Sequence, residues 1–282
     1  MNDIFEFSKK NALIIVLYKT RLVESITFNS FSDILKGTDC KMDLIVYDNS
    51  PELNVGLQEF ENWRIKYIGD PLNSGISLAY NIGARYAKDI LKKSRLLIAD
   101  QDTFFPINSI SAYVDAVEMY PLQAIYAPII KSKEIISPCR FLFNRGFTLN
   151  RVKDGLMSFK GRSLINSGCL IDLDAFFLVG GYNEKIQLDF SDFYFFEKVK
   201  AKFSEFVVVN LILSQNYSDD SDNNLKSRLF RFKFYCEGAK EFSLYKKSGV
   251  LLIVVTFIRM LKLSKMFKTK QFAVMWVKKM LL

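Results

Sequence analysis

The chain has 282 residues, of which 50% are hydrophobic and 15% aromatic, so it can bury a large core and is not a disordered protein. It contains no histidine, which argues against a zinc site and leaves acid–base and metal chemistry chiefly to Asp and Glu. Its four cysteines lie far apart and form no C-x-x-C pair, as is typical of reduced core residues.

The net charge of +9 is concentrated at one end of the chain. Residues 225–282 carry 14 Lys/Arg and two acids, whereas residues 1–224 carry 25 basic and 28 acidic residues. The basic surface therefore belongs to the tail alone, which argues against a general nucleic-acid binder. The first residues lack the basic start and apolar segment of a signal peptide, so we expect a cytoplasmic protein.

Short apolar runs alternate with helix-like segments along the first half of the chain. We predict strands at 12–18, 43–47, 64–68, 96–99 and 124–130, and helices at 22–35, 76–91 and 107–119. This alternation predicts an α/β fold with a mostly parallel central sheet and helices on both faces. The pattern weakens over 131–160, where we expect a loop or a small hairpin. Helices from 174 and 192 and a strand at 206–213 follow.

The C-terminal segment is predicted to be a basic, aromatic, helical appendage of residues 223–282, attached to a catalytic domain of residues 1–222. Its uncharged stretch, 249–258, covers about 15 Å as a helix, roughly half of a bilayer core, so it is too short to span. The flanking basic and aromatic residues predict a pair of helices lying on an anionic membrane surface. The alternative is a C-terminal helix that packs on the core with its charges in water.

The apolar run 96–99 leads into two carboxylates one residue apart, Asp100 and Asp102. The exit of a buried strand is where an α/β sheet places ligand chemistry, and side chains at i and i+2 of an extended chain point the same way. Such an oxygen pair suits a hard divalent cation that shares its ligands with substrate phosphates. The alternative is a strand followed by an acidic turn.

Further motifs accompany this pair in a fixed order. They are the strand 13–18, Val46-Tyr47-Asp48-Asn49-Ser50, Asn73-Ser74-Gly75 with Asn81-Ile82-Gly83, Asp100-Gln101-Asp102, Gly180-Gly181-Tyr182-Asn183-Glu184 and Leu188-Asp189-Phe190-Ser191-Asp192. Together they resemble the inverting glycosyltransferases of the GT-A (Rossmann-like) fold, family 2, especially the rhamnosyl- and galactofuranosyltransferase-like members. The resemblance covers residues 12–217, most of the chain.

On the donor side, the resemblance implies contacts to a UDP- or dTDP-sugar. The residues concerned are Tyr18, Asp48, Asn73, Gly75, Asn81 and Asp100. Asp48 alternatively caps a turn, and Asn73 and Gly75 alternatively begin an ordinary helix. The resemblance also implies that Asp102, with Asp100, ligates Mn²⁺ or Mg²⁺ at the diphosphate. Many relatives carry a histidine at the position of Gln215, so here an amide oxygen of Gln215 or Asn216, or water, would complete the metal shell.

On the acceptor side, direct displacement needs a carboxylate that takes a hydroxyl proton. The resemblance implies that Asp192 is this base, with Asp189 as the second candidate or a positioning residue; alternatively, Asp192 caps the helix that follows. The implied enzyme moves a rhamnose- or galactofuranose-type sugar to a polyprenyl-diphosphate-linked glycan. This is a step of bacterial surface polysaccharide (O-antigen or capsule) synthesis at the inner face of the cell membrane.

Two other functions remain open. A sugar-phosphate nucleotidyltransferase has a similar sheet, but it needs a glycine-rich basic loop after the first strand, and residues 18–22 contain no glycine. A membrane-docked protein that binds nucleotide sugars without transferring them would keep the same motifs.

Overall fold

The computed structural model describes residues 2–52, 59–215, 224–247 and 249–281. Its helices are α1 (Asn2–Lys10), α2 (Ile26–Leu35), α3 (Ile76–Arg85), α4 (Ser109–Met119), α5 (Leu173–Leu178), α6 (Ser191–Lys200), α7 (Leu225–Lys246), α8 (Gly249–Phe267) and α9 (Gln271–Met280). Its strands are β1 (Asn11–Leu17), β2 (Met42–Asp48), β3 (Trp63–Gly69), β4 (Arg95–Asp100), β5 (Thr103–Phe104), β6 (Ile125–Lys131), β7 (Ile135–Leu142), β8 (Arg145–Leu149), β9 (Gly155–Ser158), β10 (Arg162–Ser163), β11 (Cys169–Asp172) and β12 (Glu205–Gln215).

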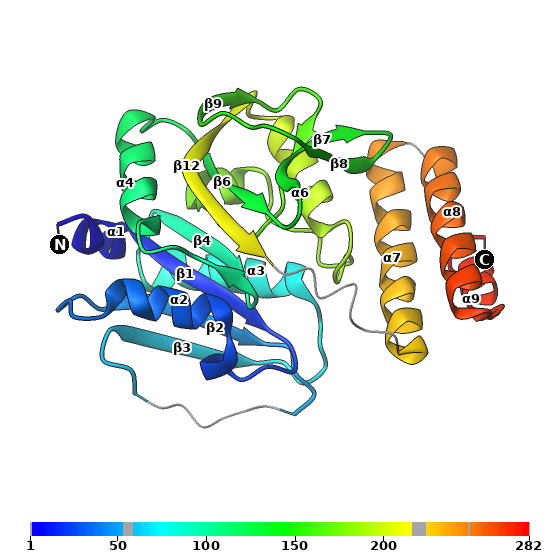
Figure 1. Cartoon of the computed structure of the whole chain (residues 1–282), viewed down its shortest axis with the longest axis horizontal. Helices are drawn as coiled ribbons and strands as arrows, with labels where there is room; N and C mark the ends of the chain where they lie inside the picture. The colour runs from blue at the N-terminus through cyan, green and yellow to red at the C-terminus, as the bar shows by residue number, and fades with distance from the viewer. Residues whose placement is uncertain (1, 53–58, 216–223, 248, 282) are drawn as a thin grey trace.

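One curled sheet runs through the described part of the chain (Figure 1). Strands β3, β2, β1 and β4 lie side by side and are parallel, and β12 is parallel to β6. The expected mostly parallel sheet needs correcting beyond these strands, because β11 is antiparallel to both β4 and β6 and β7 is antiparallel to β6 and β8. Short connections join β6 to β7 and β7 to β8, and a tight connection joins only antiparallel strands. β11 reaches β4 and β6 only after the intervening strands β7 to β10. The segment 131–160 is thus a hairpin followed by short strands.

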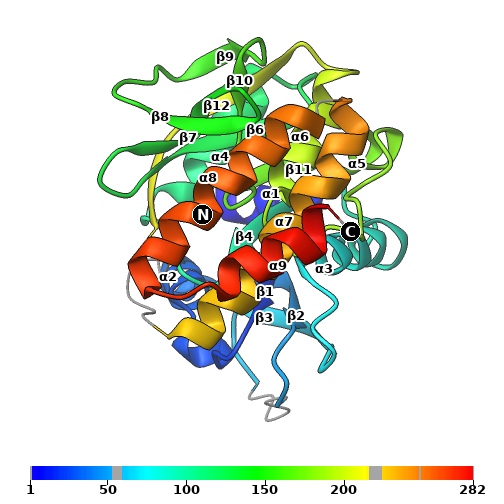
Figure 2. The same cartoon turned by 90° about the vertical axis from the view of Figure 1, so that its right-hand side faces the viewer.

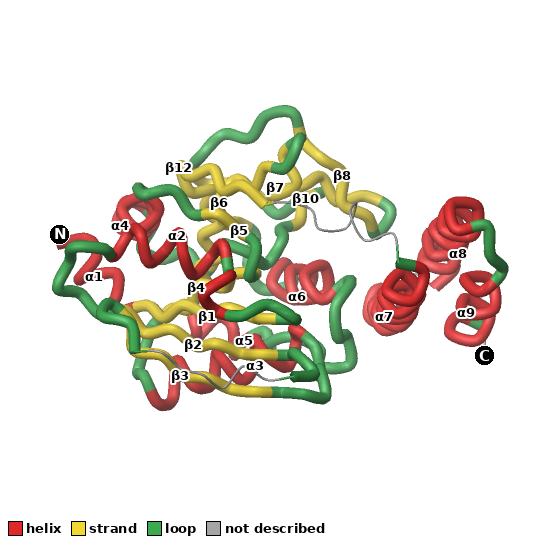
Figure 3. Tube along the Cα trace, turned by 60° about the horizontal axis from the view of Figure 1, so that its bottom comes forward, coloured by secondary structure: helices red, strands yellow, loops and turns green. Residues whose placement is uncertain are grey.

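Helices cover both faces of the sheet, as predicted (Figure 3). Successive side chains of a strand point to opposite faces, so Leu13 and Ile15 of β1 pack with Phe28 and Phe31 of α2, in a core that also takes in α1 and α4. On the other face, α3, α5 and α6 supply large aromatic side chains, including Tyr80, to a second core. Every residue of β1 is buried between these two cores.

The tail folds into three helices, α7, α8 and α9, where a pair was expected (Figure 2). Phe232 of α7 packs with Phe272 and Trp276 of α9 in a core of the tail's own. α7 also packs on the first domain, since its Phe242 lies in a cluster with Phe190. The expected alternative of packing on the core therefore holds for α7.

No helix among the described residues combines the length and the apolar character needed to cross a membrane. The predicted domain boundary at 222/223 lies outside the described residues, as does Asn216.

Candidate functional site

Three strand ends meet at one edge of the sheet. β1 lies between β2 and β4, with Leu17 opposite Asp48 and Val16 opposite Asp100, so the two acids flank the end of β1. The loop after β1 is tied to the acidic motif, because the side-chain oxygen of Gln101 accepts a hydrogen bond from the Tyr18 amide at 2.8 Å. The register therefore brings Tyr18, Asp48 and Asp100 to a common site.

Gln215 joins the two carboxylates of the acidic motif. Its Nε2 lies 3.0 Å from Asp100 Oδ2 and 3.1 Å from Asp102 Oδ1. The end of β12 pairs with β5, with Gln215 opposite Thr103, and this pairing carries the amide to the motif. On the other side, the Tyr80 hydroxyl donates to Asp100 Oδ1 at 3.1 Å. The three predicted metal ligands thus lie together.

Burial of this pair disfavours its negative charge. Burial raises the pKa of Asp100 to about 6, with the neighbouring Asp102 charge adding to the effect and hydrogen bonds from Gln215 and Tyr80 opposing it. Burial also raises the pKa of Asp102. Gln215 and Tyr80 are neutral donors, so their hydrogen bonds leave the net negative charge of the pair uncompensated.

The two carboxylates fit a hard divalent cation that takes further ligands from outside the protein. Two carboxylates are suitable oxygen ligands for Mg²⁺ or Mn²⁺. Gln215 would have to turn its amide, because its nitrogen now faces the carboxylates and only its oxygen can ligate. Within the described ranges, no three or more His, Cys, Asp or Glu side chains cluster as a metal site. Diphosphate or water oxygens would therefore complete the shell.

Asp48 is fixed by its own turn. It is 1% exposed, its Oδ1 accepts from the Ser50 amide at 2.9 Å, and its Oδ2 accepts from the Tyr67 hydroxyl at 2.6 Å. This is the turn-capping arrangement that the sequence left open. Tyr18, by contrast, directly follows β1 and is 37% exposed.

Asp70 organises the loop before α3, a role that the sequence did not single out. Its Oδ2 accepts from the Ser74 amide at 2.8 Å and from the Tyr47 hydroxyl at 3.1 Å. Asn73 sits in this loop with φ at +52°, a left-handed conformation that Asn tolerates better than most residues. The loop geometry thus depends on a carboxylate directly after β3.

Gly75 allows the start of α3 to approach the loop that precedes Asp189. It has φ at +101°, and a Cβ there would lie 2.5 Å from the Cα of Gln187. The Ile76 amide donates to the Gln187 carbonyl at 2.9 Å. The close backbone approach predicted for this glycine is therefore made to residue 187, two positions before Asp189.

Asn81, a predicted donor contact, is hydrogen-bonded to the turn 180–184 in this structure. It is 7% exposed; its Nδ2 donates to the Tyr182 carbonyl at 3.0 Å and to Glu184 Oε1 at 2.9 Å, and its Oδ1 accepts from the Tyr182 amide at 2.8 Å. Gly181 must be glycine because a Cβ there would lie 2.5 Å from Asn81 Oδ1. Asn81 therefore fixes the turn 180–184 to α3.

Asp192 lies in the first turn of α6, which is entered through Phe190 at a left-handed φ of +72°. The N-cap position belongs to Phe190, but Asp192 Oδ1 accepts a hydrogen bond from the Phe193 amide at 2.7 Å, so Asp192 does bind an amide in the first turn of the helix, as the capping alternative expected. Burial raises the pKa of Asp192 to about 7, and the charges of Asp189 and Asp100 add to this effect.

Asp189 lies beneath the tail. Its Oδ2 is 3.8 Å from Nε of Arg231 on α7, and a Cβ on Gly238 of the same helix would overlap the Asp189 carbonyl oxygen. This contact was not predicted from the sequence. A glycine inside a 22-residue helix was the available signal, since such a glycine often marks a close approach.

Comparisons with known proteins bear on the fold. No protein-family model and no curated protein sequence matches the chain. Solved structures, however, do match the chain. Staphylococcus aureus TarS superposes with a TM-score of 0.54 at 11% identity, over 83% of this chain and 40% of that one. TarS 1–349 in complex with UDP-GlcNAc gives 0.54 at 12% identity, over 86% and 70%. The chain spans less than half of the longer TarS chain, and it has a GT-A-like glycosyltransferase fold.

Proposed function

We propose that the protein is a glycosyltransferase that takes its sugar from a nucleoside-diphosphate sugar. The observation that carries the proposal is the carboxylate pair Asp100 and Asp102, joined by Gln215 at the strand ends of this fold. The structure of TarS 1–349 with UDP-GlcNAc supports a nucleotide-sugar ligand for a fold of this kind.

On the donor side, the exposed ring of Tyr18 offers a stacking surface for the base, and Asp48 keeps the adjoining turn in place. Asp100, Asp102 and the turned amide of Gln215 would hold Mg²⁺ or Mn²⁺. When bound, the ion would neutralise charge that develops on the departing diphosphate. Asn73 and Gly75 shape the neighbouring loop.

On the acceptor side, Asp192 is the proposed general base. An acceptor hydroxyl oxygen forms a bond to the anomeric carbon, the bond from that carbon to the diphosphate oxygen breaks, and the hydroxyl proton passes to Asp192. A pKa near 7 suits this role, because a base works best when its pKa lies close to the working pH. Direct displacement of this kind inverts the anomeric configuration. Asp189 would position the acceptor.

The finer assignment follows the motif resemblance. We propose a UDP- or dTDP-linked rhamnose or galactofuranose donor, a polyprenyl-diphosphate-linked glycan acceptor, and a role in O-antigen or capsule synthesis. Residues 1–222 would form the transferase domain and residues 223–282 would attach it to an anionic membrane surface at its cytoplasmic face. No nucleic-acid partner is proposed.

A second candidate is a nucleotide-sugar-binding protein without transfer activity. It is favoured by one observation, namely that a glutamine nitrogen faces the two carboxylates. Titration calorimetry with UDP and dTDP, with and without Mn²⁺, tests donor binding, and a panel of nucleotide sugars with a lipid-linked acceptor tests transfer. Binding without turnover on any donor would select the second candidate, and absence of Mn²⁺-dependent binding would refute the first.

A further inference from the structure

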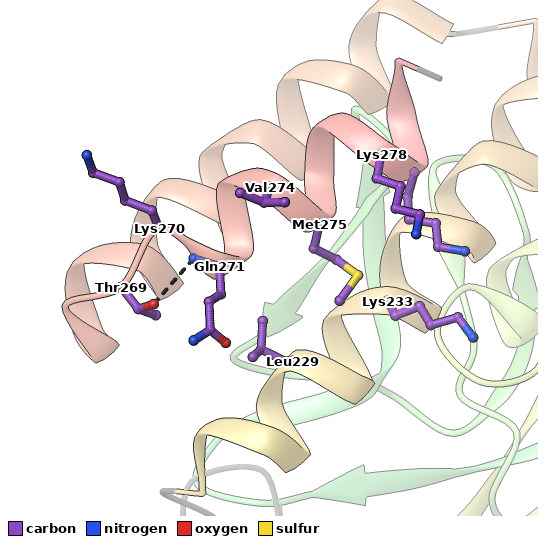
Figure 4. Close-up of a pocket in the computed structure, with 9 residues that line it drawn as sticks. Leu229, Lys233, Thr269, Lys270, Gln271, Val274, Met275 and Lys278 are labelled. Atoms are coloured by element: carbon purple, nitrogen blue, oxygen red, sulfur yellow. Dashed lines mark hydrogen bonds between the residues drawn. The ribbon is translucent and has the colours of Figure 1, made fainter.

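A groove of about 630 Å³ lies between α7 and α9, within the tail (Figure 4). Leu229 of α7 and Val274 and Met275 of α9 supply its apolar lining. Figure 4 shows Lys270 at one end and Lys233 and Lys278 at the other, with these apolar side chains between them. The groove is thus an apolar trough with a cationic rim.

The charge around this groove is one-sided. Residues 242–282 contain nine Lys/Arg and no acid. Lys279, which also lines the groove, pairs with Glu237 at 2.6 Å, so one of the four lysines is balanced locally. Lys233, Lys270 and Lys278 leave the rim with a net positive charge that is complementary to an anionic group.

The outer helices of the tail also expose apolar side chains. On α8, Val250, Val254, Ile258 and Leu261 are 79%, 47%, 52% and 51% exposed and recur at helical spacing on one face. On α9, Val274 is 68% exposed. Because α8 is apolar on its exposed side as well as on its buried side, its exposed face is suited to contact with an apolar partner and not only with water.

We infer that the groove between α7 and α9 binds the phosphate headgroup of an anionic membrane lipid. Lys233 and Lys278, which lie at the same end of the groove, would hold the phosphate oxygens, and Lys270 at the other end would attract a neighbouring anionic headgroup. Val274 and Met275 would contact the first carbons of the chains. The apolar lining favours this occupant over a nucleic acid, whose sugar-phosphate backbone would gain nothing from it. The inference rests on the proposed membrane attachment and narrows it to one site.

Vesicle flotation of the full chain tests the inference, with phosphatidylcholine vesicles and with vesicles containing 30% phosphatidylglycerol. The groove variant is Lys233→Gln/Lys270→Gln/Lys278→Gln. The control, Lys36→Gln/Lys41→Gln/Lys202→Gln, removes the same charge from exposed positions of the first domain. We expect the groove variant to lose about a hundredfold in affinity for the anionic vesicles, since each Lys at such a surface contributes about fivefold. The control should lose less than threefold.

A second pair of variants tests the apolar lining without changing charge. Val274→Ser should lower vesicle affinity about fivefold, whereas Leu122→Ser, which alters a side chain 95% exposed on the first domain, should not. Equal losses of vesicle affinity in both triple-lysine variants would refute the groove as the lipid-binding site but not the proposed membrane attachment. Failure of the unmodified chain to float with anionic vesicles would refute both lipid binding in the groove and membrane attachment. Tighter binding to a single-stranded oligonucleotide than to the vesicles would also refute both. Donor binding and transfer to a soluble acceptor are measured separately and stay independent of these outcomes.

Discussion

Arg231 of the tail lies 3.8 Å, Nε to Oδ2, from Asp189, which precedes the proposed base by three residues. The tail helix therefore borders the acceptor side of the proposed site. Removing residues 225–282 would take Phe242 out of the aromatic cluster and expose Phe190, so loss of membrane binding after such a deletion would not by itself identify an anchor.

Arg231→Met should impair acceptor use selectively, because Asp189 would lose a cationic neighbour while the donor-side residues stay in place. We expect the KM for the acceptor to rise about tenfold with the donor KM unchanged, and Arg231→Lys to restore part of the loss. Steady-state kinetics with each substrate varied in turn measures this split. A fall in kcat with both KM values unchanged would contradict a positioning role.

Asp192→Asn should abolish transfer and leave Mn²⁺-dependent donor binding intact, because only the proton acceptor is removed. Asp102→Asn is the matched comparison, and it should weaken that donor binding instead. Calorimetry and single-turnover transfer distinguish the two variants. Normal transfer by Asp192→Asn would refute the base assignment.

The pKa of Asp192 also predicts two pH dependences. Transfer requires the ionised carboxylate, so activity should rise with pH through about 7. Stability runs the other way: the folded pKa lies above the unfolded value of 3.8, so the stabilisation is complete below pH 4 and is lost as pH rises to about 7. Thermal melts at pH 5 and pH 8 should show Asp192→Asn gaining most over the unmodified chain at pH 8. An equal difference at both pH values would contradict the burial argument.

Gln215→Glu should tighten Mn²⁺ binding and lower stability in the absence of metal. A third carboxylate adds an oxygen ligand but also adds repulsion beside Asp100 and Asp102. We expect at least a tenfold gain in Mn²⁺ affinity by calorimetry, together with a lower Tm in EDTA. Gln123→Glu provides a charge-matched control far from the motif in sequence. Unchanged Mn²⁺ affinity would show that the β12 end does not contribute to the metal shell.

Gly75→Ala should cost far more stability than Gly37→Ala. Both glycines have positive φ, but Gly75 has φ 101° and ψ 169°, a conformation that is almost exclusive to glycine, whereas Gly37 has φ 73°. In addition, only the Cβ at residue 75 would meet the Gln187 backbone. We expect an additional loss of about 2 kcal/mol at residue 75, as is typical of overpacking. Urea unfolding compares the two variants, and equal losses would mean that the loop moves aside without cost.

The sequence located the strands that carry the site because each is a buried apolar run that ends in polar residues, as at Asp48 and Asp100. The motif resemblance predicted that Gln215 lies with Asp100 and Asp102, and the pairing of β12 with β5 brings it to Asp102 across more than 100 residues. The contact of Asn81 with Tyr182, over a similar separation, could not be predicted, because neither the apolar pattern nor the motif spacing pairs these segments. The antiparallel strand β11 was also unforeseen, because a buried apolar run does not reveal the direction of its neighbour.

Gly238 limits where chimeras of this protein can be joined. Since α7 leaves no space for a side chain against the Asp189 carbonyl, the tail and the loop that carries Asp189 and Asp192 would have to be exchanged together. A chimera that takes its last helices from another protein of this fold, joined near residue 223, would pair a foreign helix surface with this loop. A junction placed before residue 180 would keep the two together, so the proposed acceptor site and the proposed membrane contact would be inherited together.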